Sequence, residues 1–291
     1  MTTLLESWTA ARDRLRAAGI DSPVLDARLL LEAATGAGRS DILSDPHRPL
    51  TPDQAAALDA LLGRRERREP ISHILGRRGF WSIMLKVTPD VLAPRPETEL
   101  LVETALGTFP ERARFSVLDL GVGSGAILLA VLAERPGAKG LGVDVSEEAL
   151  AVARENAANL GLADRCALLR GDWTTGLDDE AFDLVLSNPP YIPTGDIAGL
   201  EPEVREHEPR LALDGGADGL DAYRRLAPEI LRVLKPGGHF AVEVGAGQCE
   251  PVLALFRAAG AADLRALKDL SGIDRVAAGS KKPLGIRANN S

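Results

Sequence analysis

The sequence predicts an α/β fold, a doubly wound Rossmann-like sheet preceded by a small all-helical domain and a β-hairpin linker. Three observations support this prediction: helical spacing of apolar residues over the first seventy positions, a period of two between residues 80 and 94, and alternating strand-like and helix-like segments from residue 96 onward. A chain of 291 residues also has room for two domains. We expect a helical domain over 1–75, the linker over 76–95, a catalytic domain over 96–280 and a flexible tail over 281–291.

Apolar residues mark one buried face in each predicted helix of the first domain. In the first helix this face comprises Leu4, Trp8, Ala11, Leu15 and Ala18. A second helix begins at Asp21-Ser22-Pro23, a capping residue followed by proline, and its expected buried residues are Val24, Ala27, Leu31 and Ala34. Thr51, with Gln54 three residues later, forms a capping box that opens a third helix.

The third helix ends in a charged run, Arg64-Arg65-Glu66-Arg67-Arg68-Glu69. Contact with RNA or a partner is one interpretation of such a run. Arginine is abundant throughout this chain, however, with 28 Arg to 6 Lys. We therefore interpret the run as a solvated helix end.

A change in the spacing of apolar residues along the chain predicts the linker and the sheet. Apolar residues alternate with others at Trp81, Ile83, Leu85 and Val87, and Thr88-Pro89-Asp90 is a turn, which indicates a β-hairpin or extended arm. The candidate strands beyond it are Val117–Leu120, Gly140–Val145, Cys166–Arg170, Phe182–Ser187 and His239–Val244. Helical stretches such as Ala126–Glu134 and Glu147–Leu160 separate them, so we expect βαβ units and a parallel sheet covered on both faces.

Charge and composition exclude several classes of function. Residues 96–291 carry 20 Lys+Arg against 30 Asp+Glu, and so acidic a domain is a poor general clamp for nucleic-acid phosphates. No apolar run approaches the roughly 18 residues of a membrane span, and no signal-peptide pattern opens the chain, so we expect a cytoplasmic protein. Cys166 and Cys249 have no nearby second cysteine, so neither a disulfide framework nor a metal site is expected.

A glycine-rich turn follows the first predicted strand of the sheet. It reads Gly121-Val122-Gly123-Ser124-Gly125, with Asp119 two residues ahead, and its glycines allow backbone to approach a ligand closely. Its G-x-G-x-G pattern differs from the dinucleotide fingerprint and is similar to the loop of class I methyltransferases, which bind S-adenosyl-L-methionine (AdoMet). Asp144 ends the next strand, where a carboxylate accepts hydrogen bonds from ribose hydroxyls. Asp144 therefore indicates a nucleoside, either in AdoMet or in a nicotinamide cofactor, and a helix-capping residue is the alternative interpretation.

Trp173 follows the third strand of the sheet and is one of three tryptophans. An indole stacked on adenine gains about 1–3 kcal/mol, by analogy with bases stacked on aromatic side chains. We expect Trp173 to contact the adenine, and a plain core tryptophan is the alternative.

The strongest motif, Asn188-Pro189-Pro190-Tyr191, ends the fourth strand. The first and fourth strands are neighbours in a doubly wound sheet, so this tetrad and the glycine loop are expected to open into one crevice. The two prolines hold the chain extended and donate no hydrogen bond, which leaves the Asn188 side-chain oxygen and the Pro189 carbonyl as acceptors. This pair suits a substrate NH2 group.

Such a site solves a chemical problem of amide nitrogen, whose lone pair is delocalised. Accepting both N–H bonds favours the pyramidal geometry that localises the lone pair, so no strong base is required. Tyr191 is expected to pack over the group and face the developing positive charge. A rigid surface turn is the alternative interpretation of the tetrad.

These segments together resemble the bacterial peptide chain release factor glutamine-N5 methyltransferases, the HemK/PrmC family of class I AdoMet-dependent methyltransferases. The resemblance runs from about residue 70 to 279 and is carried by 118–127 (LDLGVGSGAI), 182–192 (FDLVLSNPPYI), Arg95–Glu99, Glu208–Leu213 and Gly272–Val276. It implies methylation of the glutamine in the Gly-Gly-Gln motif of class I release factors, with S-adenosyl-L-homocysteine as product. It also implies that the helical domain recognises the release factor.

The resemblance assigns roles to individual positions. The implied cofactor residues are Gly121, Val122, Gly123, Ser124, Gly125, Asp144, Trp173 and Asn188. The implied substrate residues are Asn188, Pro189, Pro190 and Tyr191, with Asn188, Pro189 and Tyr191 catalytic and no metal required. Two departures are small, since Val122 replaces a frequent threonine and His207 a more usual aromatic residue.

Three other functions are compatible with parts of the pattern. Adenine-N6 DNA methyltransferases share the tetrad, but they require a basic face and a recognition domain for the duplex. A glutamine-N5 methyltransferase of a large-subunit ribosomal protein has the same motifs. A catalytically silent AdoMet-binding partner would keep only the cofactor residues. We expect no direct nucleic-acid substrate and no membrane association.

Overall fold

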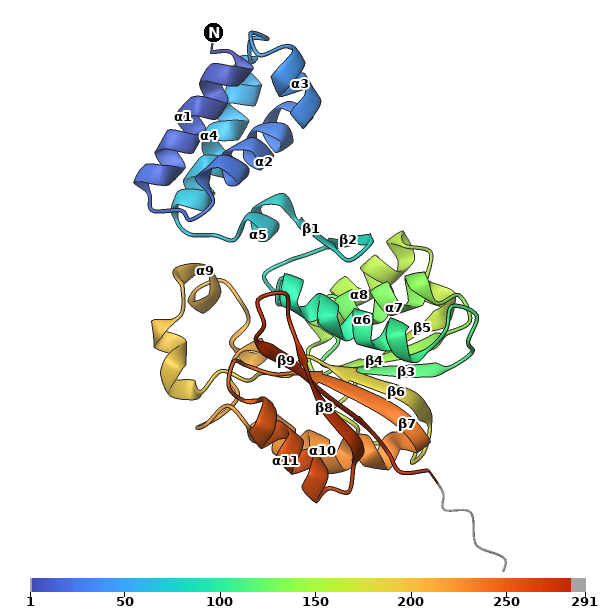
Figure 1. The fold of residues 1–291 in the computed structure, drawn as a ribbon. Helices are drawn as coiled ribbons and strands as arrows, with labels where there is room; N and C mark the ends of the chain where they lie inside the picture. Colours follow the sequence, from blue (N-terminus) through green and yellow to red (C-terminus); the bar gives the residue numbers. More distant parts are fainter. Residues whose placement is uncertain (1, 284–291) are drawn as a thin grey trace, which may run out of the picture. The chain divides into compact units, whose positions relative to one another are not determined.

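The computed structural model describes residues 2–283, which form two compact units (Figure 1). One unit contains the chain up to Arg77 together with Glu201–His207. The other contains Arg78–Leu200 and the chain from Glu208 onward. Most of the expected tail, residues 284–291, lies outside the described residues, whereas the backbone N–H of Lys281 donates to the Gly238 carbonyl at 2.8 Å.

The helical unit is built from five helices of the amino-terminal segment and one short helix from the later segment. They are α1 (Leu4–Ala17), α2 (Pro23–Thr35), α3 (Arg39–Ser44), α4 (Pro52–Glu66), α5 (Ile71–Leu75) and α9 (Pro202–Arg205). Thr51 and Gln54 form the predicted capping box of α4. Leu4, Ala11 and Leu15 are buried in a core of their own, so the predicted face of α1 is confirmed there.

Two predictions about this unit are wrong. Val24 is 50% exposed, because α2 turns Asp26 and Leu30 toward the core in its place. Arg65 is not at a solvated helix end, since it is only 6% exposed.

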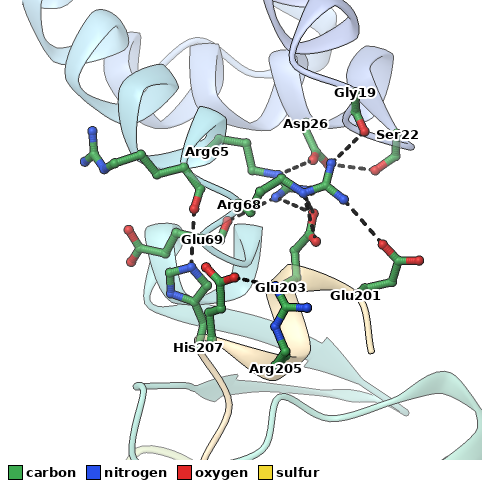
Figure 2. Close-up of polar contacts among 12 residues, drawn as sticks. Gly19, Ser22, Asp26, Arg65, Arg68, Glu69, Glu201, Glu203, Arg205 and His207 are labelled. Carbon is green, nitrogen blue, oxygen red and sulfur yellow. Dashed lines mark hydrogen bonds and ion pairs between the residues drawn. The ribbon is translucent and has the colours of Figure 1, made fainter. Parts of the chain in front are cut away.

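Arg65 and Arg68 instead bind the later segment of the same unit (Figure 2). Arg65 donates from Nε to the buried carboxylate of Asp26 at 2.8 Å and from Nη1 to Glu203 at 3.0 Å. Arg68 donates to Glu203 at 3.0 Å and to the Gly19 carbonyl at 2.6 Å. These bonds incorporate Glu201–His207 into the helical unit.

A short hairpin joins β1 (Arg77–Phe80) to β2 (Ile83–Lys86). Leu85 and Val87 are fully buried, as the period of two predicts. Trp81 lies in the connecting turn at φ 52° and not on a strand.

The second unit contains a seven-stranded sheet in the order β5-β4-β3-β6-β7-β9-β8. Its strands are β3 (Ser116–Leu120), β4 (Lys139–Asp144), β5 (Cys166–Arg170), β6 (Phe182–Ser187), β7 (Leu234–Glu243), β8 (Ala262–Lys268) and β9 (Asp274–Ser280). All five predicted strands are present and pair in parallel, and β3 lies beside β6 as expected. The sheet is mixed and not purely parallel, because β9 pairs antiparallel with β7 and β8.

Helices cover both faces of this sheet (Figure 1). One face packs against α6 (Glu99–Thr108), α7 (Ala126–Glu134) and α8 (Glu147–Asn159). The other packs against α10 (Asp221–Val233) and α11 (Cys249–Ala258). The predicted doubly wound α/β fold is therefore confirmed, and its ligand crevice is expected outside the carboxyl ends of the parallel strands.

Over residues 2–283, no helix has both the length and the apolar character needed to cross a bilayer. The same residues contain no group of three or more His, Cys, Asp and Glu side chains arranged to hold a metal ion. Cys166 and Cys249 are free thiols.

Candidate active site

A cavity of about 490 Å³ lies at the carboxyl ends of β3, β4, β5 and β6. Most of the residues predicted to bind a ligand line it, namely Gly121, Val122, Gly123, Ser124, Asp144, Trp173, Asn188 and Pro190. Gly125, Pro189 and Tyr191 are not among its lining residues. The glycine loop and the tetrad thus open into one space, as the strand order requires.

The glycine loop is shaped by backbone that other residues rarely adopt. Gly121, Gly123 and Gly125 have φ of 75°, 52° and 85°. The Gly123 N–H donates to Asp144 Oδ2 at 2.9 Å, and the Ser146 N–H donates to Asp144 Oδ1 at 3.0 Å. Because each carboxylate oxygen accepts about two hydrogen bonds, Asp144 keeps acceptor capacity for a ligand.

Trp173 borders the same cavity from the loop after β5. It is half-buried at φ 53°, and its Cζ3 lies 3.7 Å from where a Cβ on Gly121 would stand. Its ring therefore contacts both the apolar core and the cavity, which leaves an indole surface for a ligand.

Asp119 lies beneath the loop and is fully buried. Its Oδ2 accepts a hydrogen bond of 3.2 Å from the Leu128 N–H in the first turns of α7. Burial raises the pKa of Asp119 to about 7, although the Leu128 N–H opposes the shift and the charge of Asp144 adds to it. Asp119 thus holds the glycine loop against its helix without entering the cavity lining.

The tetrad is held by two residues outside the predicted site residues, Thr98 from the segment Arg95–Glu99 and Glu243 from the end of β7. Asn188 Nδ2 donates to Thr98 Oγ1 at 3.2 Å, and the Tyr191 hydroxyl donates to Glu243 Oε1 at 3.4 Å. Burial raises the pKa of Tyr191 above its usual range, so its hydroxyl keeps its proton at neutral pH. Glu243 was detectable only as a polar residue at the end of a buried strand.

Segments quoted for the resemblance meet around this site. Glu208 accepts hydrogen bonds from the Ala93 N–H at 3.1 Å and from Arg95 at 3.2 Å. The backbone after it approaches the tetrad so closely that a Cβ on Gly215 would lie 2.8 Å from the Tyr191 Cα. This glycine is required by close packing of backbone on backbone.

The strand order, with a glycine loop and an acidic residue at the ends of adjacent parallel strands, defines a class I methyltransferase. Residues 112–267 match the family model described as a methyltransferase domain, and residues 6–76 match the PrmC N-terminal domain. The chain is 67% identical over 282 residues to the release factor glutamine methyltransferase of Caulobacter vibrioides, covering 97% of this chain and 98% of that protein. This protein belongs to the release factor glutamine methyltransferase family.

Further relatives agree with this assignment. The release factor glutamine methyltransferase of Rhodospirillum rubrum is 48% identical over 284 residues, covering 96% of this chain and 87% of that protein. A crystal structure of a methyltransferase from Pyrococcus furiosus aligns with a TM-score of 0.51 at 19% identity, covering 68% of this chain and 88% of that chain, and supports the fold alone.

Methyltransferases of this class take the methyl group from AdoMet, and the cavity suits that molecule. It brings together the backbone of the glycine loop, the carboxylate of Asp144 and the indole of Trp173, which are groups of the kind that a nucleoside requires. The predicted class, fold and methyl donor are therefore confirmed.

Proposed function

We propose that this protein methylates the side-chain amide nitrogen, N5, of the glutamine in the Gly-Gly-Gln motif of class I peptide chain release factors. The methyl donor is AdoMet, and the product is S-adenosyl-L-homocysteine. The observation that carries the proposal is the shared cavity, which Asn188 of the tetrad and the glycine loop line together. The names of the full-length relatives support the choice of substrate.

In this proposal the cofactor is held by the glycine loop and two side chains. Asp144 accepts hydrogen bonds from the ribose hydroxyls with the oxygens that already hold Gly123 and Ser146. Trp173 stacks on the adenine. AdoMet supplies an electrophilic methyl group on its sulfonium.

The acceptor glutamine is bound by the tetrad. The Asn188 side-chain oxygen and the Pro189 carbonyl accept the two hydrogens of the glutamine NH2 group, which directs the nitrogen lone pair toward the methyl group. A C–N bond forms as the S–C bond breaks, and the cationic nitrogen then loses one proton to water. Tyr191 remains a neutral phenol and packs beside the positive charge that develops.

Recognition of the protein substrate is assigned to the helical unit in the same proposal. A single glutamine must enter a narrow cavity, so the rest of the release factor requires a separate binding surface. Release factors act in the cytoplasm, and we place the enzyme there with its substrate. No direct nucleic-acid substrate is expected.

Methyl transfer to purified, unmethylated release factor from labelled AdoMet tests this function. We expect one methyl group per release factor on the glutamine of the tripeptide, located by mass spectrometry of the digested product. A release factor with that glutamine changed to asparagine is the matched control and should accept none.

A hypomethylated cell lysate included in the same assay separates the alternatives. Label on a large-subunit ribosomal protein in place of the release factor would contradict the proposal, and so would label on adenine in added DNA. Cofactor binding without methyl transfer to any protein would identify a silent binding partner.

A further inference from the structure

A buried asparagine on α8 connects the glycine loop to the hairpin. Asn156 lies in the last turn of α8 and is 1% exposed. Its side chain forms hydrogen bonds with Ser124 of the loop and with Lys86 of β2, which are 32 and 70 positions away in the sequence. Asn156 therefore joins two distant segments of the catalytic unit, and neither bond contributes to the helix itself.

The Asn156 amide forms three hydrogen bonds, all with main-chain groups. Its Nδ2 donates to the Ser124 carbonyl at 2.9 Å and to the Lys86 carbonyl at 3.0 Å. Its Oδ1 accepts from the Lys86 N–H at 2.7 Å. A flipped amide would set its oxygen against two carbonyls, so these partners fix the orientation of the group. Both amide hydrogens of Asn156 are thus in use.

On the hairpin side, the bonds pin the end of a short strand. Lys86 is the last residue of β2, and Asn156 pairs with both of its main-chain polar groups. A two-stranded hairpin is marginally stable by itself, so such anchoring matters. The residues on either side add apolar contacts, because Leu85 belongs to the core beneath α7 and α8 and Val87 packs against α8.

On the loop side, Asp144 and Asn156 anchor different peptide groups. Asp144 accepts from the Gly123 N–H at 2.9 Å, whereas Asn156 donates to the Ser124 carbonyl. Ser124 is 3% exposed, so water does not replace this bond. Rotation of the Ser124 carbonyl away from Asn156 would leave a buried donor unpaired, which is costly.

Both connected segments reach the cofactor cavity. Ser124 lines it from the glycine loop, and residues 90–92 line it shortly after Lys86 in the chain. Asn156 is not itself among the lining residues. It therefore holds two parts of the cavity wall together from behind.

We propose that Asn156 is a positioning residue that couples AdoMet binding to the stability of the hairpin. AdoMet restrains the glycine loop, and the three hydrogen bonds carry that restraint to β2. Coupling between two sites is reciprocal, so a loosened hairpin weakens AdoMet binding. The inference goes beyond the proposed function, because it does not depend on which molecule accepts the methyl group. Absence of methyl transfer to release factor would contradict the proposed function and leave the binding measurements below intact.

Calorimetry with S-adenosyl-L-homocysteine, the unreactive product, tests the positioning. Asn156→Ala should weaken its affinity about tenfold or more, because the loop carbonyl and the hairpin lose their shared anchor. Asn156→Asp keeps an acceptor for the Lys86 N–H but offers no hydrogen to the two carbonyls, and should weaken binding similarly. Asn159→Ala, at an exposed position of the same helix, is the matched control and should stay within about twofold. Wild-type affinity in both Asn156 variants would overturn the proposal.

Hydrogen exchange distinguishes coupling from a general structural role. In the wild type, saturating S-adenosyl-L-homocysteine should slow the exchange of residues 80–87 about fivefold or more. In Asn156→Ala, saturating ligand should still protect the glycine loop but no longer residues 80–87. Equal protection of residues 80–87 in the two proteins would mean that the effect passes through residues 90–92 alone, and it would overturn the proposal.

A reciprocal test starts from the hairpin. Val87→Ala loosens the packing on α8 and leaves the atoms of the three hydrogen bonds in place, and we expect about threefold weaker binding of S-adenosyl-L-homocysteine. The same change in Asn156→Ala should add little, since the connection is already broken, and additive losses would contradict the coupling. Should Asn156→Ala fail to fold, the wild type alone remains decisive, because residues 80–87 left unprotected by the ligand would overturn the proposal.

Discussion

Glu203 accepts a hydrogen bond of 3.0 Å from Arg65, which precedes it by 138 positions. The same guanidinium pairs with Asp26, whose side chain is 2% exposed. A segment that interrupts the catalytic unit in sequence is thereby part of the helical unit. The helical unit is therefore formed by two segments, one before and one after the tetrad in the sequence.

Arg65→Met should destabilise the helical unit by about 3–5 kcal/mol, because it leaves the buried Asp26 carboxylate without its cationic partner. Urea unfolding followed by hydrogen exchange over residues 4–66 measures the effect. Arg67→Met, at an exposed position of the same run, is the matched control and should change stability little. Equal midpoints for the two variants would show that the buried pair is energetically unimportant.

Asp144→Ala should weaken AdoMet binding about ten- to a hundredfold, or roughly 1.5–3 kcal/mol. The substitution removes a charged acceptor for ribose hydroxyls and also the anchor of the Gly123 N–H. Asp144→Asn keeps one oxygen and should lose less. Calorimetry with AdoMet measures both affinities, and wild-type affinity in the alanine variant would remove Asp144 from the cofactor site.

Asn188→Ala should lower the single-turnover rate by about two orders of magnitude or more, while AdoMet affinity falls much less. Asn188→Asp keeps an acceptor oxygen and should retain more activity than alanine, despite its added charge and the lost donor to Thr98. Both substrates are held at saturating concentrations. Near wild-type transfer by the alanine variant would reduce the tetrad to a binding turn.

Removal of the helical unit should raise the KM for release factor far more than the Kd for AdoMet. Deleting residues 1–76 alone would strip Glu203 of its partners, so the variant also needs a glycine-serine replacement of residues 201–207. The catalytic unit keeps its own core on both sheet faces and should stay folded. Equal turnover of intact release factor by the two proteins would exclude the helical unit from recognition.

The buried Asp119 gives stability a pH dependence of defined sign. Its folded pKa, raised to about 7 by burial, lies above the ordinary value near 3.8, so the folded state keeps a proton that the unfolded state loses. Stability should therefore fall as the pH rises from about 4 to 7, by on the order of a few kcal/mol. Asp119→Asn lacks this titrating group. The difference between its urea midpoint and that of the wild type should therefore shift in favour of the variant between pH 5 and pH 8. A constant difference would contradict the shift.

Local patterns in the sequence determined much of this protein. The period of two, the capping residues and the alternation of strands with helices located Cys166–Arg170, Phe182–Ser187 and Ala126–Glu134 with the bounds that the structure has. The motifs, read with the rule that ligands bind at strand ends, placed the glycine loop, Asp144 and Asn188 around one cavity. The bounds of the helices and strands depend on residues that are close together in the sequence. The position of the site follows from the strand order, for which few alternatives exist.

Only the tertiary structure decided which distant groups meet. In the sequence Arg65 is one of many arginines, and its neighbours do not identify a partner. In the structure it donates a hydrogen bond to Glu203, which lies 138 positions later. Val24 satisfies the helical period, yet it is exposed because the Asp26 pair turns another face inward. Periodicity records which residues share a face, whereas burial of a charge and a hydrogen bond such as that from Asn188 to Thr98 depend on partners brought together by folding.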